Sequence, residues 1–131
     1  MKSFRLTYPA RFDIREILVR SELDHGVAAS RRYERLIATA LHDIAAEPER
    51  NGSMARPELG AGVRTWHLRG SRERARQWDG VVRRPRHFLI YKAIDPQIVA
   101  VGRVLHDAME LRRHLAALED PFADLPTYHG E

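Results

Sequence analysis

Cysteine is absent from the 131 residues of this chain, which excludes disulfides and thiolate metal ligands and suits a reducing compartment. Nowhere do about 18 apolar residues follow one another, the length that a membrane-spanning helix needs, and the first twelve residues lack the apolar core of a secretory signal. We therefore expect a cytoplasmic protein with no membrane partner.

Motifs of metal and cofactor chemistry are also missing. The seven histidines form no HExxH pattern, and the glycines at positions 60 and 62 are not followed by the GK[ST] of a phosphate loop. None of the serines lies in a nucleophile-elbow setting. The expectation is a protein without metal or cofactor.

The composition describes one soluble domain with a basic surface. Hydrophobic residues make up 44% of the chain and charged residues 31%, and the net charge is +4. A positive sign raises the chance of an anionic partner, either nucleic acid or an acidic protein segment.

The first part of the chain predicts a strand followed by two helices. Phe4, Leu6 and Tyr8 alternate with polar residues, as in a half-buried strand that Pro9 ends. Helical spacing follows over residues 10–23, with a stop at His25-Gly26. The clearest period in the sequence, at positions 33, 36, 37, 40, 41 and 44, predicts a second helix that Pro48 ends.

Residues 51–62 are rich in glycine, proline, serine and asparagine and predict a loop without regular structure. Three strands are then expected at residues 63–69, 86–93 and 98–106, and a short last helix from Asp107. This order, β-α-α-β-β-β-α, predicts an α+β fold with an antiparallel sheet packed on a helical hairpin. The last residues, 119–131, are expected to form a mobile tail.

Three segments in this order carry a family resemblance: RPELGAGVRTW at 56–66, HFLIYKAI at 87–94 and RVLHDAMEL at 103–111. Together with the element order they resemble the RelE/ParE toxin superfamily, and the ending RVLH before a helix is most similar to its ParE branch. The resemblance covers about residues 3–115. It implies the toxin of a type II toxin–antitoxin pair, silenced by a cognate antitoxin similar to ParD.

The resemblance implies two activities. ParE-type toxins inhibit DNA gyrase by binding, whereas RelE-type toxins are endoribonucleases that cut mRNA on the ribosome. Strand parity places Arg103 on one face with Val101 and Leu105, and His106 on the other with Val104, so these two residues are not expected to act as a pair. We favour the gyrase inhibitor, which has no catalytic residues; the alternatives are the nuclease and a degenerate, non-toxic binding module.

Candidate site residues follow from these alternatives. If the protein is a nuclease, its catalytic residues are Arg64, His87 and Arg103, because RNA cleavage needs proton transfer and charge neutralisation. The candidate binding residues for gyrase, with its DNA as a possible further partner, are Arg64, Trp66, Arg83, Arg84, Arg86, Tyr91, Arg103, His106, Leu111 and Arg112. The antitoxin is expected to be acidic and amphipathic and to occupy a groove at Ile17, Tyr33, Leu36 and Ile37.

One segment departs from the family. Residues 69–85 stand where the family has a tight turn, so we treat them as an insertion within a toxin domain of residues 1–118 and expect a ribbon, a flap or a disordered loop. The insertion is rich in arginine and contains Trp78. A charged loop of this kind is usually solvated, but an exposed tryptophan favours a contact surface.

Overall fold

The computed structural model describes residues 3–108 and Phe122. Its helices and strands are β1 (Ser3–Leu6), α1 (Tyr8–His25), α2 (Val27–Ala46), β2 (Met54–Ala55), β3 (Arg64–His67), β4 (His87–Asp95) and β5 (Ile98–His106), with short 3-10 helices η1 (Pro57–Leu59) and η2 (Leu68–Ser71). The predicted α+β class and the order β-α-α-β-β-β are confirmed. The last helix was predicted to begin at Asp107. Asp107 and Ala108 form a turn, and the rest of the predicted helix falls outside the described residues.

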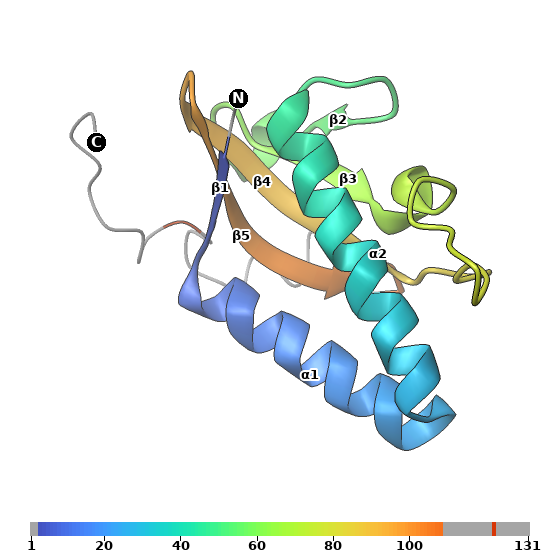
Figure 1. The fold of residues 1–131 in the computed structure, drawn as a ribbon. Coiled ribbons are helices and arrows are strands. Elements are labelled where there is room, and N and C mark those ends of the chain that lie inside the picture. The colour runs from blue at the N-terminus through green and yellow to red at the C-terminus, as the bar shows by residue number, and fades with distance from the viewer. Residues whose placement is uncertain (1–2, 109–121, 123–131) are drawn as a thin grey trace.

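The five strands form one sheet in the order β1-β5-β4-β3-β2 (Figure 1). All neighbours are antiparallel except β1 and β5, which pair in parallel. The prediction of an antiparallel sheet therefore needs a correction at this edge. Strands so far apart in sequence are not joined by a hairpin, so nothing forces them to run in opposite directions.

Helix α1 begins at Tyr8, earlier than the sequence predicted. Thr7 is its N-cap, and the hydroxyl oxygen of Thr7 accepts a hydrogen bond from the backbone N–H of Ala10 at 3.1 Å. Pro9 lies in the first turn, where a missing N–H costs nothing. Pro9 thus belongs to the helix start, and the strand ends before it because Thr7 caps the helix.

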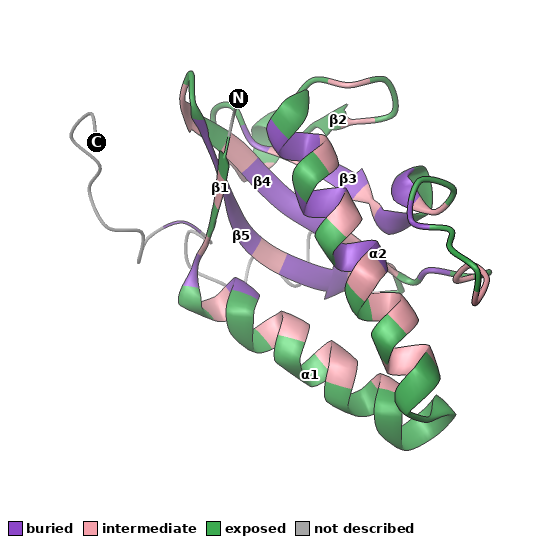
Figure 2. Ribbon diagram, in the orientation of Figure 1, coloured by how far each residue is buried: buried purple, intermediate pink, exposed green. Residues whose placement is uncertain are grey.

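The helical hairpin turns at a single residue, Gly26, whose positive φ of 94° suits glycine. Helix α2 buries the residues that its period predicted: Leu36, Ile37, Ala40, Leu41 and Ile44. Figure 1 shows both helices on the same side of the sheet, and Figure 2 shows the buried residues along α2 and the central strands. The main core therefore lies between the hairpin and the sheet.

The opposite face of the sheet carries a smaller apolar cluster of Val63, Ile90, Ala100, Leu105 and Phe122. Phe122 is 5% exposed, and the Lys92 ammonium lies 4.7 Å from the centre of its ring. The other residues of the predicted tail lie outside the described part of the chain.

Strand β5 contains a bulge that changes its parity. Ile90 pairs with Arg103 but Tyr91 pairs with Val101, so Gly102 is the additional residue. Val101 consequently packs in the core under the helices, whereas Leu105 packs on the opposite face. The prediction that these two share a face is wrong, because simple alternation does not continue through a bulge.

The predicted loop at residues 51–62 contains regular structure. Met54 pairs with Thr65 and Ala55 with Arg64, which adds β2 as a short edge strand. The backbone N–H of Arg56 donates to the carbonyl of Val63 at 2.8 Å, and η1 follows. The glycine and proline residues of this segment lie in its turns and at η1, and they do not prevent the pairing of β2 with β3. Across the described residues, no helix is long and apolar enough to cross a membrane.

Candidate functional site

A groove of about 1160 Å³ lies between the helical hairpin, the ends of β4 and β5, and the end of the insertion. Most of its lining residues are polar or charged, and five of them are arginines, but apolar atoms make up most of its exposed surface. The lining comprises Glu16, Ile17, Arg20, Ser21, Asp24, His25, Ala29, Arg32, Tyr33, Val81, Val82, Arg83, Arg84, Arg86, His87 and His106. We call it the histidine groove, because His87 and His106 lie at its β4–β5 end.

Tyr33 of α2 and His87 of β4 form a short hydrogen bond in the histidine groove. The Tyr33 hydroxyl lies 2.6 Å from His87 Nδ1 and accepts a hydrogen bond from the backbone N–H of Arg86 at 3.1 Å. Burial, together with nearby His106, lowers the pKa of His87 to about 4. Burial also raises the pKa of Tyr33 to about 12, so at neutral pH a tyrosine O–H donates to a neutral imidazole.

His106 completes the pair across the strands. It is the direct partner of His87 in the β4–β5 register, and the two rings meet edge to face with centroids 5.1 Å apart. His106 Nδ1 accepts from the backbone N–H of Ala108 at 3.0 Å. This contact ties the end of β5 to the turn that follows, and the His106 ring also lines the groove.

A further histidine, His67, lies beside the histidine groove, in an adjoining basic hollow of about 490 Å³. His67 Nε2 is 2.9 Å from the carboxylate of Asp107, which also accepts from Arg86 Nε at 3.0 Å. Burial lowers the pKa of His67. For Asp107, burial alone would raise the pKa, but hydrogen bonds from His67 and Arg86 outweigh it and lower it.

The hydrogen-bond network assigns the same tautomer to the imidazoles of His67, His87 and His106. Nδ1 is the acceptor in each ring, from the Tyr33 hydroxyl, from the Ala108 N–H and, for His67, from the Arg69 N–H at 3.0 Å. A neutral imidazole whose Nδ1 accepts carries its proton on Nε2. His87 and His106 therefore present N–H donors, and the arginines around them are donors as well. Around these two rings the histidine groove presents mainly hydrogen-bond donors, although Glu16 and Asp24 also line it, and neither ring offers a free Nδ1 as a base.

No group of histidine and acidic side chains within residues 3–108 has the arrangement of a metal site. His67 and His87 are engaged through hydrogen bonds with Asp107 and Tyr33.

Comparison with known proteins shows a likeness to a solved structure. No family model matches the chain, and no curated protein matches it. The chain is similar to a solved structure. That structure is described as the crystal structure of the toxin–antitoxin complex RelBE2 from Mycobacterium tuberculosis; the identity is 24%, the match covers 80% of this chain and 96% of that chain, and the TM-score is 0.48.

The three residues considered for catalysis do not come together. Arg103 forms a two-point ion pair with Asp13 of α1, with 2.7 and 3.0 Å between the atoms. Arg64 Nε donates to the Ser53 hydroxyl at 2.7 Å, beside the β2 edge. Only His87 lines the histidine groove. Arg64 and Arg103 thus serve local structure, because each is held by partners that are away from the groove.

Two of the predicted binding residues are interior. Trp66 is 4% exposed, and its indole N–H donates to the Ser71 hydroxyl. Tyr91 is fully buried and donates to the carbonyl of Pro48 at 2.6 Å. We correct both from surface residues to core residues. Their aromatic side chains on inward-facing strand positions are explained by packing.

The remaining binding candidates divide into two groups. Arg83, Arg84, Arg86 and His106 lie together in the lining of the histidine groove. Leu111 and Arg112 lie outside the described residues. The predicted antitoxin groove also needs correction, since Leu36 and Ile37 are 1% and 2% exposed and belong to the core. Its other members, Ile17 and Tyr33, line the histidine groove.

An apolar stripe on α1 is a surface that sequence reasoning missed. Tyr8, Phe12, Val19 and Leu23 are all exposed, at 77%, 58%, 47% and 77%. They follow one another at intervals of four, seven and four residues, which places them on one side of a helix. We call these four residues the α1 stripe. Its signal was present in the sequence, but it was masked by the second apolar side at Ile14, Ile17 and Leu18, which packs against the core.

Proposed function

We propose that this protein is the toxin of a type II toxin–antitoxin pair in the RelE/ParE superfamily. The element order supports this, as do the positions of the three resembling segments. The RPELGAGVRTW segment spans η1 to β3, HFLIYKAI lies in β4, and RVLH ends β5. In this proposal residues 1–118 form the toxin domain, with residues 69–85 as its insertion, and the protein acts in the cytoplasm.

We further infer that the toxin acts by binding DNA gyrase, or the DNA that gyrase holds, and breaks no bond itself. The observation that carries this inference is the cluster of hydrogen-bond donors at the β4–β5 end of the histidine groove. The Nε2–H groups of His87 and His106, beside Arg83 and Arg84, suit phosphates or carboxylates. General-base catalysis needs an accepting nitrogen near neutral pH, and Nδ1 of each ring is already engaged.

RNA cleavage is the second candidate, and one observation favours it. Tyr33, His87 and His106 lie together beside arginines, and this set of residue types includes the acids and phosphate clamps that RNA cleavage uses. A substrate that displaced Tyr33 from His87 would free Nδ1 as a base. This candidate therefore requires a rearrangement that gyrase binding does not.

The decisive experiment mixes the purified protein with gyrase, ATP and supercoiled plasmid. Protein-linked linear DNA after detergent and protease treatment is the expected result. A variant with Arg83→Ala and Arg84→Ala should lose at least tenfold in potency if the histidine groove contacts the target, because two charged contacts are removed. The matched control is Arg11→Ala, an exposed arginine on α1 that does not line the groove.

No linear DNA, with active gyrase controls, would contradict gyrase binding, and ribosome-dependent mRNA cleavage would then be assayed with His87→Gln. Induced expression that leaves a bacterial host unharmed, with no antitoxin bound, would contradict the toxin itself.

The antitoxin would use two surfaces. We propose that an amphipathic helix of the antitoxin packs on the α1 stripe, since exposed apolar side chains at helical spacing suit an apolar helix face. An acidic segment of the same partner would enter the histidine groove and neutralise its arginines. We expect the antitoxin gene to adjoin this one.

A further inference from the structure

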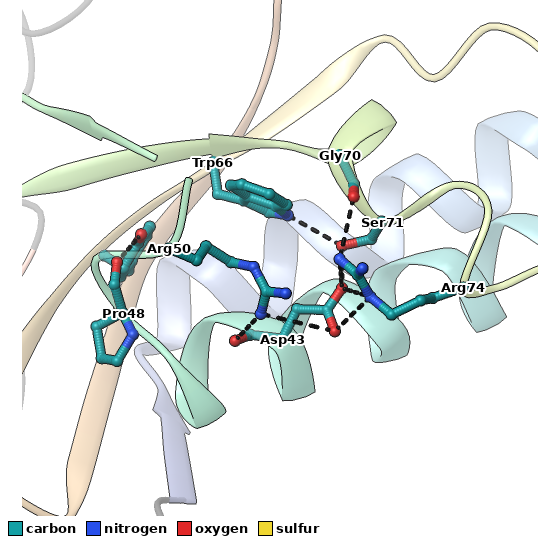
Figure 3. Close-up of polar contacts among 8 residues, drawn as sticks. Asp43, Pro48, Arg50, Trp66, Gly70, Ser71 and Arg74 are labelled. Carbon is teal, nitrogen blue, oxygen red and sulfur yellow. Dashed lines mark hydrogen bonds and ion pairs between the residues drawn. The ribbon is translucent and has the colours of Figure 1, made fainter. Parts of the chain in front are cut away.

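The arginine-rich insertion is a folded part of the domain. Ser71 and Ala75 are 0% and 7% exposed, and Ala75 belongs to the main core. Figure 3 shows the anchor at its start: the Asp43 carboxylate accepts from the Ser71 hydroxyl at 2.6 Å and from Arg74 at 3.0 Å, and Ser71 accepts from the Trp66 indole. This corrects the expected flap, because buried side chains and a buried carboxylate fix the segment on α2.

A tight turn at the tip of the insertion is fixed as well. Gln77 and Gly80 exchange two backbone hydrogen bonds of 3.2 and 2.9 Å, which close a turn around Trp78 and Asp79. Asp79 forms a two-point ion pair with Arg35 of α2, and Arg35 Nε also donates to the carbonyl of Ala75 at 2.9 Å. The turn is thus braced against a helix, so the position of Trp78 is defined.

Trp78 itself is 94% exposed on this braced turn. Tryptophan is the side chain with the largest apolar area, and leaving it in water forfeits its burial energy. These contacts fix Gln77 and Asp79, the two neighbours of Trp78 in the turn, but they leave the Trp78 indole exposed to solvent. A fixed and uncovered indole suits a partner with a flat aromatic face.

The surface beside this turn is basic. A hollow of about 600 Å³ adjoins it and is lined by Arg32, Arg72, Arg76 and Arg83, with Glu73 and Asp79 as its acidic residues. Asp79 is already paired with Arg35, and Glu73 with Arg76 at 3.1 Å. The remaining positive charge favours a polyanion over a neutral apolar partner.

We propose that Trp78 and this hollow bind a single-stranded nucleic acid, with a base stacked on the indole and the adjacent phosphates held by the arginines. Stacking on an aromatic side chain beside a basic groove is how single strands are bound without sequence preference. A duplex keeps its base faces covered by their neighbours, so it cannot offer one to Trp78. This surface would be a second nucleic-acid surface, additional to the histidine groove. The proposal does not depend on the proposed function.

The test uses the two tryptophans of the full-length protein. Trp66 is buried and Trp78 is exposed, so acrylamide reaches mainly Trp78. Titration with a single-stranded oligouridine of about ten nucleotides should quench the exposed fluorescence and protect it from acrylamide. Fluorescence anisotropy of a labelled oligouridine gives the affinity. Trp78→Leu should weaken binding about tenfold, and Trp78→Phe should bind within about threefold of the original protein.

Salt dependence tests the arginines separately. Arg72→Ala, which lines this hollow and not the histidine groove, should lower the slope of log affinity against log salt by about one, while the exposed control Arg11→Ala should leave the slope unchanged. The Trp66 emission of Trp78→Leu confirms that this variant is folded. Equal binding by Trp78→Leu and the original protein, equal binding of a duplex, or protection of Trp78 by an acidic peptide but not by oligouridine would each overturn the proposal.

Discussion

His87 is a buried histidine whose charge state changes the stability of the whole domain. Its pKa in the folded protein is about 4, against an ordinary value of 6.5. The unfolded chain therefore binds more protons than the folded protein between these two values, and stability falls as the pH falls from 6.5 to 4. The full shift corresponds to about 3 kcal/mol, and partial exposure of the ring reduces our expectation to about 2 kcal/mol.

Urea unfolding at pH 7.0 and at about pH 4.5 measures this loss. In His87→Gln, which keeps an acceptor for Tyr33, the difference between the two pH values should be clearly smaller. It should not vanish, because burial lowers the pKa of His67 in the same direction. The same difference in both proteins would show that His87 is not the titrating group.

Arg103 is a second residue whose role the structure redefines. Its ion pair with Asp13 is largely buried, with side-chain exposures of 17% and 12%, and Asp13 also accepts from the backbone N–H of Val104. Arg103→Ala should cost about 3 kcal/mol of unfolding free energy, because it leaves a buried carboxylate without its cation. Thermal or urea unfolding measures the loss.

The double variant with Asp13→Ala should be less destabilised than the sum of the single variants, since each partner is costly mainly when it is left alone. Additive costs would mean that the pair does not act as a unit. Reduced toxicity of Arg103→Ala would then need comparison with its folded fraction before any role in target binding is assigned.

At the scale of elements, η2 is held by the contact between its glycine and Trp66. A Cβ atom placed on Gly70 would lie 2.4 Å from the indole ring. We expect Gly70→Ala to destabilise the protein by about 2 kcal/mol, since Trp66 is enclosed and cannot move aside. The control is Arg69→Ala in the same turn, where the side chain is exposed and the cost should stay below about 0.5 kcal/mol. Similar unfolding midpoints for the two variants would contradict the crowding.

The α1 stripe belongs to the same scale, because its four side chains act as one face of a helix. Phe12→Ser and Leu23→Ser should leave the unfolding midpoint nearly unchanged, as both side chains are exposed already. Each should weaken antitoxin binding at least tenfold in a titration. The control Ala38→Ser, at an exposed position of α2, should have no effect on either measurement. Unchanged antitoxin affinity in the double variant would remove the stripe from the interface.

Element type was predictable from the sequence, whereas the site was only partly so. The α2 period and the alternation of β1 follow from burial on one side of an element, which a pattern reports directly. The other features of the fold and the site depend on how the strands pair. The Gly102 bulge, the parallel β1 and the meeting of His87 with His106 depend on register, which one sequence does not encode locally. Tyr33 was assigned to an apolar groove because its spacing is helical, and its hydroxyl contact with His87 has no signal in the sequence.

At the scale of the whole molecule, the insertion is a structural component of the fold. Replacing residues 72–84 by an Asn-Gly turn would remove the core contact of Ala75, the partner of Arg35 and one partner of Asp43. We expect a loss of about 3 kcal/mol, measured by urea unfolding. If the segment were an independent loop, the shortened protein would be as stable as the original, because long surface loops cost little to close.

The parallel pairing of β1 with β5 also sets an order of events during synthesis. The Thr7 hydroxyl donates to the carbonyl of Gly102, 95 residues further along the chain, and Thr7 also caps α1. At about 5 to 20 residues per second, a ribosome needs roughly 5 to 20 s between these two residues. During that interval the amino-terminal strand lacks β5, the strand with which it pairs, and the sheet under the helical hairpin is incomplete. The sheet can therefore be completed only after β5 has been synthesised. Until then, the exposed surfaces of α1 and α2 are accessible to any partner that is already present.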